Sequence, residues 1–332
     1  MTRVFRTDSS TLRTYADCDL KGLLRYGLHF TRPEESAPAK AGTAVHKAIE
    51  SLFRGGTKEE ALNAFSNDYA AFCVEKQIPL DDRLHYDNIY KIVSTWIDEN
   101  PLDSLPFVVH SDLVEIAART LLVEDPPIEY GGRQDAIVQT RTPVVVPGGG
   151  EELPWSVLDV KTTGQMNPRW MRSFKSSFQM MGYVWLARRH GFNVNSVIIL
   201  AIEMGKLPAS TRKCPAHGVP YIECGAQHMK SSVFKVEFSD AKLKQWERVA
   251  THLSLKARDL TLRYTKPELA PLALGTGTAR YQVCGGCEFA DFCMQDRRPE
   301  VLKSLYTHRE WNPFADLSDE AVTLGFGAAK EA

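Results

Sequence analysis

Three short segments, far apart in the chain, carry residue types that together suit the hydrolysis of a phosphodiester bond. A GTAVH run ends at His46, a GGRQD run ends at Asp135, and an LDVKTT run carries Asp159 and Lys161. Two carboxylates brought together repel each other unless a cation lies between them. Oxygen ligands suit Mg²⁺ or Mn²⁺, and an added imidazole ligand favours Mn²⁺. We therefore expect a divalent metal bound by His46, Asp135 and Asp159.

The spacing within each segment supports this chemistry. Asp159 and Lys161 are separated by one residue, so on a β-strand both side chains project from the same face. Asp135 follows Gly131 and Gly132, which we interpret as a bend entering the neighbouring strand. A metal held here would orient and acidify a water molecule, and Lys161 would hold that water or stabilise the charged transition state.

A predicted helix over 168–190 follows this strand directly. On a helical wheel, one face carries polar side chains that suit a phosphate backbone and an adjacent base or sugar. These are Arg172, Lys175, Gln179 and Tyr183. The opposite face is apolar and predicts core packing, with Phe174, Phe178, Met181 and Trp185.

Cysteines cluster near the C-terminus in YQVCGGCEFADFC, which places Cys284, Cys287 and Cys293 together. Three thiolates are one short of a tetrahedral site, and Cys18 is the best candidate for the fourth. Such a site would join the first helix to the last segment. The spacing leaves zinc and an iron–sulfur cluster open.

A second group of metal-binding residue types lies between two predicted strands, in KCPAHGVPYIECGAQH. Its spacing fits a small zinc knuckle, but an uncoordinated hairpin loop is the favoured interpretation. The residues are Cys214, His217, Cys224 and His228.

Bulk properties are those of an ordinary globular protein. The chain has 332 residues, 43% of them hydrophobic, and a formal net charge of −1. A nucleic-acid partner would therefore be held by a local basic stripe rather than by the overall field. No apolar run is long enough to span a membrane, and the N-terminus lacks the apolar core of a secretory signal. We expect a cytoplasmic protein with reduced thiols.

The periodicity predicts helices before, between and after a set of short β-branched strands. Helical patterns cover 11–30, a segment starting near Gly42, 58–100 with a break at 78–82, and about 240–263. Strand patterns cover 114–123, 128–139, 155–163, 194–204 and 232–239. This order predicts an α/β fold with a mixed central sheet flanked by helices.

Taken in chain order, these motifs resemble the PD-(D/E)XK nuclease superfamily, and specifically its RecB-like branch. Iron–sulfur members of that branch include the AddB-type nuclease and the CRISPR-associated four-cysteine exonucleases. The resemblance rests on His46, the G-x-x-D at Gly132 and Asp135, and the D-x-K at Asp159 and Lys161. It also rests on a Q-x3-Y motif and on an early cysteine with C-x2-C-x5-C, carried by Gln179, Tyr183, Cys18, Cys284, Cys287 and Cys293.

The resemblance implies a restriction-endonuclease-like domain over 1–300 and a C-terminal tail over 301–332. Within the domain it implies a helical section at about 44–106, a catalytic core at about 112–265, and a cysteine segment at 280–296 that ties the termini together. It further implies Mn²⁺ or Mg²⁺ catalysis, a [4Fe-4S] cluster rather than zinc, and exonuclease action on DNA, often single-stranded. Glu115, which opens the first core strand, is implied to lie near the site.

Three functions follow as hypotheses. The first is a metal-dependent DNA exonuclease with the Val160 carbonyl as a further metal ligand, acting in recombination, repair or CRISPR-type processing. The second is a DNA-binding adaptor of the same fold that cuts only within a larger complex. The third is a sequence-specific endonuclease, which ranks last because no separate specificity domain is evident. Digestion polarity, oligomeric state and a host or phage origin stay open.

Overall fold

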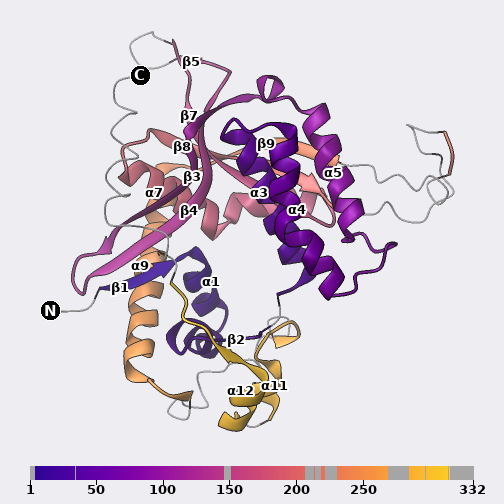
Figure 1. The fold of residues 1–332 in the computed structure, drawn as a ribbon. Helices are drawn as coiled ribbons and strands as arrows, with labels where there is room; N and C mark the ends of the chain where they lie inside the picture. Colours follow the sequence, from indigo (N-terminus) through magenta and orange to yellow (C-terminus); the bar gives the residue numbers. More distant parts are fainter. Residues whose placement is uncertain are drawn as a thin grey trace.

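A mixed β-sheet crosses the centre of the molecule, with helices on both of its faces (Figure 1). The computed structural model describes residues 4–33, 35–145, 151–205, 213, 218–220, 230–267, 284–295, 297–312 and 314. The predicted fold class, an α/β protein with a mixed central sheet flanked by helices, is confirmed.

The sheet is ordered β1-β4-β7-β8-β9, and β3 pairs with the other edge of β4. The β1–β4 and β7–β8 pairs are parallel, while β3–β4, β4–β7 and β8–β9 are antiparallel. The strands are β1 (Phe5–Asp8), β3 (Phe107–Val123), β4 (Ile128–Thr140), β7 (Trp155–Thr163), β8 (Val194–Glu203) and β9 (Lys230–Glu237). Two small pairs lie outside this sheet: β2 (Phe30–Thr31) with β10 (Thr307–His308), and β5 (Val144–Val145) with β6 (Glu151–Glu152).

Three helices cover one face of the sheet: α3 (Ala37–Phe53), α4 (Lys58–Glu75) and α5 (Tyr86–Glu99). Buried residues recur along α3 at helical spacing, which gives it an apolar stripe facing Leu158 and Leu200 of the sheet. The α4 helix begins with a capping box, because Thr57 and Glu60 satisfy each other's backbone N–H groups.

The opposite face is covered by α1 (Ser9–Asp17), α7 (Phe178–Arg189) and α9 (Asp240–Arg263). Side chains at their N-caps accept backbone hydrogen bonds and fix where the helices begin, at Asp8, Ser177 and Ser239. Tyr130 of β4 is fully buried between the rings of Trp185 and Trp246, with centroids 5.8 and 5.2 Å away.

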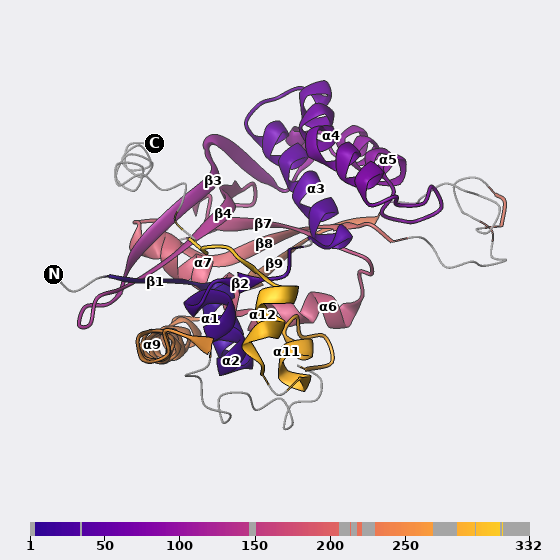
Figure 2. The ribbon, with the colours of Figure 1, turned by 60° about the horizontal axis from the view of Figure 1, so that its bottom comes forward.

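A third apolar cluster joins the two ends of the described chain. The elements after α1 are α2 (Asp19–Gly22) and a π-helical turn (Leu23–Gly27), and they pack against the far end of α9. The same cluster takes in α11 (Ala290–Met294) and α12 (Pro299–Leu305) through Phe289, Phe292 and Leu302. Figure 2 shows these first and last segments side by side below the sheet.

Two predicted helices are wrong in their continuity. The 168–190 segment divides into α6 (Pro168–Ser173), a 3-10 turn (Phe174–Ser176) and α7, because Ser177 is extended and caps a new helix. Arg172 and Lys175 therefore do not share a helical face with Gln179 and Tyr183. Likewise, the 11–30 segment is interrupted at Cys18, whose backbone is extended between α1 and α2.

Most predicted strands match the structure, with three differences. The β3 strand begins at Phe107 rather than at 114, and its register shifts between Val109 and Val114. The β1 strand was not predicted, because four residues are too few to show a period. Gly131 and Gly132 lie inside the continuous β4 strand rather than at a bend into it.

Other expectations meet the limits of the described chain. No helix among the described residues has the length and apolar character that crossing a bilayer requires. The domain boundary expected at residue 300 falls inside α12. Cys214, His217, Cys224 and His228 all lie outside the described residues.

The contact between α7 and β4 generates a stability prediction. An alanine Cβ at Gly182 would lie 2.1 Å from the Tyr130 hydroxyl, which is held by Ser9 at 2.6 Å. Overpacking costs about 1–3 kcal/mol, and the better helix propensity of alanine offsets at most about 1 kcal/mol. We expect Gly182→Ala to lower the free energy of unfolding in urea by about 1 kcal/mol. An alanine at the exposed position Asn63 of α4 is the control and should not destabilise; equal stability of both variants would contradict this packing.

Candidate active site

The site forms where the edge of β4 loses its neighbours. On one edge, β3 pairs with β4 from Ile128 to Thr140. On the other edge, the β1 ladder ends at Gly131 and the β7 ladder begins at Ala136. The gap between β1 and β7 therefore leaves the edge of β4 open at 132–135, and Asp135 lies at the end of this gap.

The Asp135 carboxylate bridges the elements around this opening. Its Oδ2 atom accepts a hydrogen bond from the Val160 backbone N–H of β7 at 2.7 Å. The same oxygen lies 3.5 Å from Nδ1 of His46, which comes from α3 above the sheet. One carboxylate thus contacts both the strand that carries Asp159 and the helix that carries His46.

Close packing between α3 and β7 fixes the position of His46. A Cβ at Gly42 would lie 3.0 Å from the Thr162 hydroxyl, so a larger residue would push the helix outward. Ala41, Ala44 and Val45 are buried beside it. The small residues before His46 thus allow α3 to approach the sheet closely.

Asp159 lies beneath this opening with 2% of its side chain exposed, paired with Lys161. The Lys161 ammonium donates to Oδ1 of Asp159 at 2.8 Å, as expected for two residues on one strand face. It also lies 2.7 Å from Oδ2, so one ammonium group contacts both oxygens of this buried carboxylate.

The two aspartates titrate in opposite directions. Burial raises the pKa of Asp159 to about 6, a rise that Lys161 opposes and Asp135 reinforces. Burial would also raise the pKa of Asp135, but His46, Lys161 and the Val160 N–H outweigh it and hold the pKa below its ordinary value. For His46, burial lowers the pKa, and the Asp135 carboxylate reverses this so that the net shift is upward.

Glu115 adds a third carboxylate beside Asp135. The register pairs Val114 with Ala136 and Ile116 with Gln134, which places Glu115 opposite Asp135. Its backbone has a φ of 55°, which is strained for a non-glycine residue. Burial, then Asp135 and Glu50, raise its pKa to about 7, although Arg133 lies 3.7 Å away.

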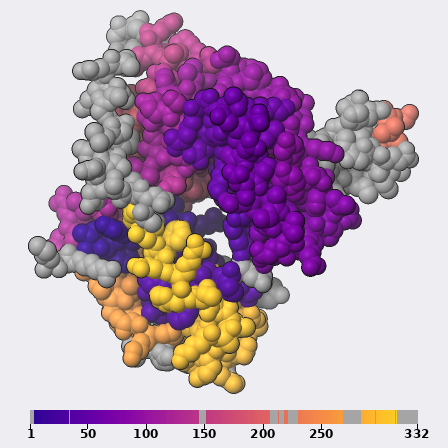
Figure 3. Space-filling view, viewed as in Figure 1, coloured from indigo at the N-terminus to yellow at the C-terminus, as the bar shows by residue number. Residues whose placement is uncertain are grey.

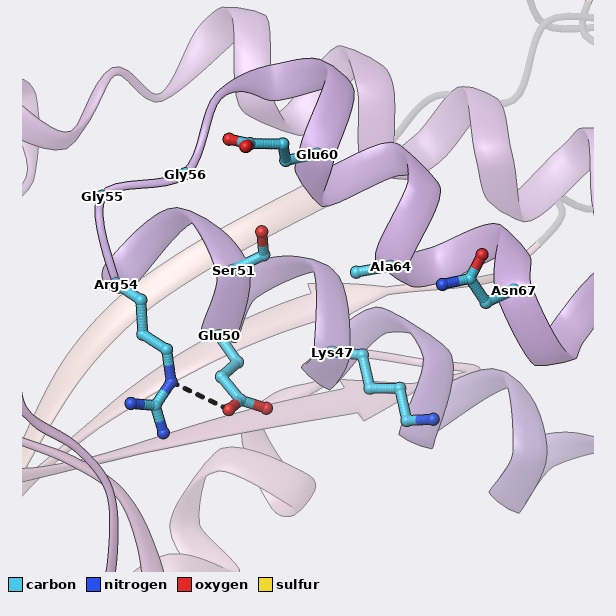
Figure 4. Close-up of a pocket in the computed structure, with 9 residues that line it drawn as sticks. All are labelled: Lys47, Glu50, Ser51, Arg54, Gly55, Gly56, Glu60, Ala64 and Asn67. Carbon is cyan, nitrogen blue, oxygen red and sulfur yellow. Dashed lines mark hydrogen bonds and ion pairs between the residues drawn. The ribbon is translucent and has the colours of Figure 1, made fainter.

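A cleft of about 520 Å³ opens over these groups. Its lining includes His46, Glu50, Glu115, Asp135 and Thr162, whereas Asp159 is not part of the lining. A second groove of about 680 Å³ between α3 and α4 continues from it, because both share Lys47 and Glu50 (Figure 4). In that groove Arg54 pairs with Glu50, and Gly55 and Gly56 form the turn at its end.

Glu50 and Lys47 were missed by sequence reasoning. Glu50 follows His46 by four residues, so both lie on one face of α3. A search for carboxylates at that spacing from His46 would have found it. Lys47, which pairs with Asp68 at 2.6 Å, carries no such signal.

Gln179 and Tyr183 lie on the other side of the sheet from α3. The Gln179 amide donates to the Tyr183 hydroxyl at 2.8 Å. A Cβ at Gly132 would lie 3.1 Å from the Tyr183 ring, so this glycine gives the ring its room. Burial, followed by Asp159 and Asp135, raises the pKa of Tyr183 well above its ordinary value. Arg172 and Lys175 are exposed on separate short elements.

The four candidate cysteines of the C-terminal site lie in the third apolar cluster or beside it. Cys18 and Cys287 pack against that cluster, and none of the four forms a disulfide. Burial raises the pKa of Cys287, and the thiols of Cys18 and Cys284 add to the shift. Cys293 shows the same pattern, with a pKa raised to about 11. The thiols are therefore near enough to repel one another when ionised.

Neither site is preassembled for metal. Among the residues that the structure describes, no three His, Cys, Asp or Glu side chains are gathered at ligand spacing. Metal binding would draw these side chains closer together, because ligand bonds are about 2–2.6 Å long.

One family model matches most of the chain. The family model described as the PD-(D/E)XK nuclease superfamily matches residues 9–294. Among solved structures, a candidate exonuclease from Eubacterium rectale is similar, with 11% identity, 77% of this chain and 80% of that chain covered, and a TM-score of 0.43. The protein SSO0001 is 10% identical, with coverage of 86% and 94% and a TM-score of 0.31. No curated protein matches the sequence.

The shifted pKa values predict how the free energy of unfolding of the metal-free protein depends on pH. In the folded protein the pKa of Glu115 is raised to about 7 and that of Asp159 to about 6. At any pH between the ordinary and the raised pKa of such a group, the folded state therefore holds more protons than the unfolded state. The raised pKa of His46 acts in the same direction, because its contribution is lost as pH rises. Stability should therefore fall from about pH 5 to about pH 7. The lowered pKa of Asp135 acts only below its ordinary 3.8, outside this window.

Glu115→Gln isolates one of these groups. Denaturation in EDTA should show a shallower fall for the variant, by on the order of 1–2 kcal/mol across the window. The control is Asp98→Asn, because Asp98 is exposed and pairs with Lys58 outside the lining of the site cleft. This variant should show the same dependence of stability on pH as the wild type. A Glu115→Gln slope as steep as that of the wild type would mean that Glu115 ionises at an ordinary pKa.

Proposed function

Because this chain belongs to the PD-(D/E)XK nuclease superfamily, we propose that it is a metal-dependent DNA exonuclease. It hydrolyses phosphodiester bonds in single-stranded DNA or at DNA ends. The observation that carries the proposal is the meeting of His46, Asp135, Asp159 and Lys161, from three distant segments, around one gap in the sheet.

The residues present fit a divalent cation. Oδ2 of Asp159 is buried with the Lys161 ammonium 2.7 Å away, and burial raises the pKa of this carboxyl, so a second cation would stabilise its ionised form. The ligands would be His46, Asp135, Asp159 and the Val160 carbonyl. Mg²⁺ and Mn²⁺ both suit the oxygen donors, and the imidazole favours Mn²⁺. Bound there, the cation would supply a water of lowered pKa and neutralise charge on the phosphate.

The remaining roles fall to the chain's own side chains. Lys161, with 27% of its side chain exposed, is the cation available to the attacking water or to the developing charge on the phosphate. Gln179 and Tyr183, which are joined by a hydrogen bond, position the DNA strand and the carboxylate side of the site. Arg172 and Lys175 are exposed and contact the DNA backbone from outside this pair.

Cys18, Cys284, Cys287 and Cys293 hold a [4Fe-4S] cluster in this proposal, with zinc as the less favoured occupant. The mutual effect of these thiols on their pKa values supports their proximity. The cluster is structural, because hydrolysis moves no electrons. It would fasten the terminal segments that pack in the third apolar cluster. The RecB-like resemblance is the ground for a role in recombination, repair or CRISPR-type processing, with protein partners.

The competing adaptor function shares the fold but lacks activity alone. The intact set of two acids and a lysine disfavours it, because a scaffold does not need all three. Labelled single and double strands, marked at either the 5′ or the 3′ end, should be degraded from an end by the lone protein in Mn²⁺ or Mg²⁺. Circular DNA should survive. Intact linear substrate would favour the adaptor, and cut circles would favour an endonuclease.

Two substitutions test the catalytic assignment. Lys161→Ala removes the cation beside the phosphate and should lower the cleavage rate by about 10²–10³-fold. Asp159→Asn removes a charged metal ligand and should lower it at least as far. Lys58→Ala and Asp98→Asn are the matched controls. These two residues form an exposed ion pair with a distance of 2.6 Å between Nζ and Oδ2. Cleavage by the site variants at the rate of these controls would refute the assignment, provided that all bind DNA in EDTA.

Cys287→Ser tests the cluster. The wild type, purified without oxygen, should be brown with broad absorbance near ~400 nm, and the variant should lose both. Cys73→Ala is the control, because Cys73 lies in α4 away from the other thiols and should leave the spectrum unchanged. A colourless wild type that contains stoichiometric zinc would contradict the iron–sulfur assignment.

A further inference from the structure

The last described residues form a strap across the front of the molecule. From α12 the chain runs through β10, which pairs with β2 by Thr307↔Thr31 and His308↔Phe30. It ends at Phe314, which is buried against Gly131 of β4. Here the strap denotes residues 306–312 and 314. Because Gly131 lies four residues before Asp135, the strap reaches the same strand as the proposed catalytic site.

Two rings of the strap, those of His308 and Trp311, lie at the surface. Trp311 is 43% exposed, and its ring centroid lies 5.7 Å from that of Tyr26 in an edge-on arrangement of 70°. His308 packs edge-on against Phe30 at 6.1 Å. We call Tyr26, Phe30, His308 and Trp311 the aromatic rim. An edge-on contact holds a ring in place while leaving one of its faces open.

The backbone beneath the rim is strained and closely held. His29 has a φ of 61°, which is unfavourable for a residue other than glycine. Its carbonyl accepts from the Arg309 N–H at 2.8 Å, and its Nδ1 accepts from the Trp311 N–H at 3.2 Å. Strain of this kind persists where surrounding contacts enforce it, often at binding sites. The contacts of His29 fix where the Trp311 ring stands.

The charges around the rim are balanced rather than basic. Arg25 lies over Tyr26 at 5.6 Å but pairs with Glu288, and Arg32 pairs with Asp291. Arg309 is followed by Glu310. Attraction of phosphates would therefore be weak here. Stacking of bases on aromatic faces needs no net charge and tolerates any sequence.

A short connection joins the rim to the helix that lines the site cleft. The chain continues from β2 through 32–36 into α3, whose Pro38, Ala39 and Gly42 line the site cleft. Figure 3 shows a hollow between the yellow strap and the indigo to purple helices. A strand that passes over the rim would enter this hollow.

We propose that Trp311, with Tyr26, stacks against the bases of a single DNA strand on its way to the catalytic residues. The proposal rests on the proposed function and adds the part of the molecule that selects the substrate. Bases in a duplex are stacked and paired, so only a single strand or a frayed end presents free faces to the rim. Trp311 is in this account a specificity residue, not a catalytic one.

Binding of two matched oligonucleotides tests the proposal. One is a labelled oligo(dT), and the other has the same length and phosphates but abasic sites at every position. Fluorescence anisotropy in EDTA measures both without cleavage. The wild type should bind oligo(dT) about tenfold more tightly than the abasic strand. Trp311→Ala should lose most of that preference by weakening oligo(dT) binding alone, and Trp311→Phe should retain most of it.

Leu305→Ala is the control, since Leu305 is 44% exposed in α12 and belongs to no ring pair. It should behave as the wild type. If Trp311→Ala does not fold, Trp311→Leu replaces it, because leucine keeps apolar volume without an aromatic face. Equal weakening of both oligonucleotides by the Trp311 variant, or no weakening of either, would overturn the proposal. A docking site for a protein would give the second result.

The outcome is separable from that of the proposed function. A protein that cleaves nothing but shows the base preference would lose the nuclease assignment and keep the rim. A protein that cleaves ends but binds abasic and normal strands equally would lose the rim and keep the nuclease assignment.

Discussion

The gap between β1 and β7 on one edge of β4 is the feature on which the rest of the site depends. A strand inside a sheet forms hydrogen bonds to its neighbours with its backbone N–H and C=O groups. Where β4 has no neighbour on that edge, the Asp135 carboxylate takes the place of a strand and accepts the free Val160 N–H. This single hydrogen bond ties the catalytic candidates of two strands together and presents the same carboxylate to His46 of α3.

The gap also explains the electrostatics. Burial of Asp159, reinforced by the nearby Asp135, raises the pKa of Asp159 to about 6, although Lys161 and His46 oppose the rise. Two neighbouring carboxylates favour a bound cation, because a divalent ion offsets the repulsion between them more fully than one ammonium group does. The strained Glu115, opposite Asp135, extends the acidic surface into the open cleft.

Sequence alone predicted the parts of this site that follow from short periods. The D-x-K pair of Asp159 and Lys161 obeys strand alternation, so the meeting of the two side chains on one strand face could be predicted. What could not be predicted depends on distant contacts. Long-range contacts fix the break at Ser177, the short β1 strand and the pairing of the strap with β2, and the local sequence does not identify the residues that make these contacts. The roles of Gln179 and Tyr183 stay predictions.

Locating the metal tests the central claim most directly. Crystals of the protein soaked in Mn²⁺ should show, at the manganese absorption edge, an anomalous peak at the gap in β4. We predict that the peak lies within about 2–2.6 Å of Asp135 and Asp159 oxygens, with the His46 imidazole as a further ligand. A fully occupied manganese elsewhere, with no density between these two carboxylates, would contradict the account.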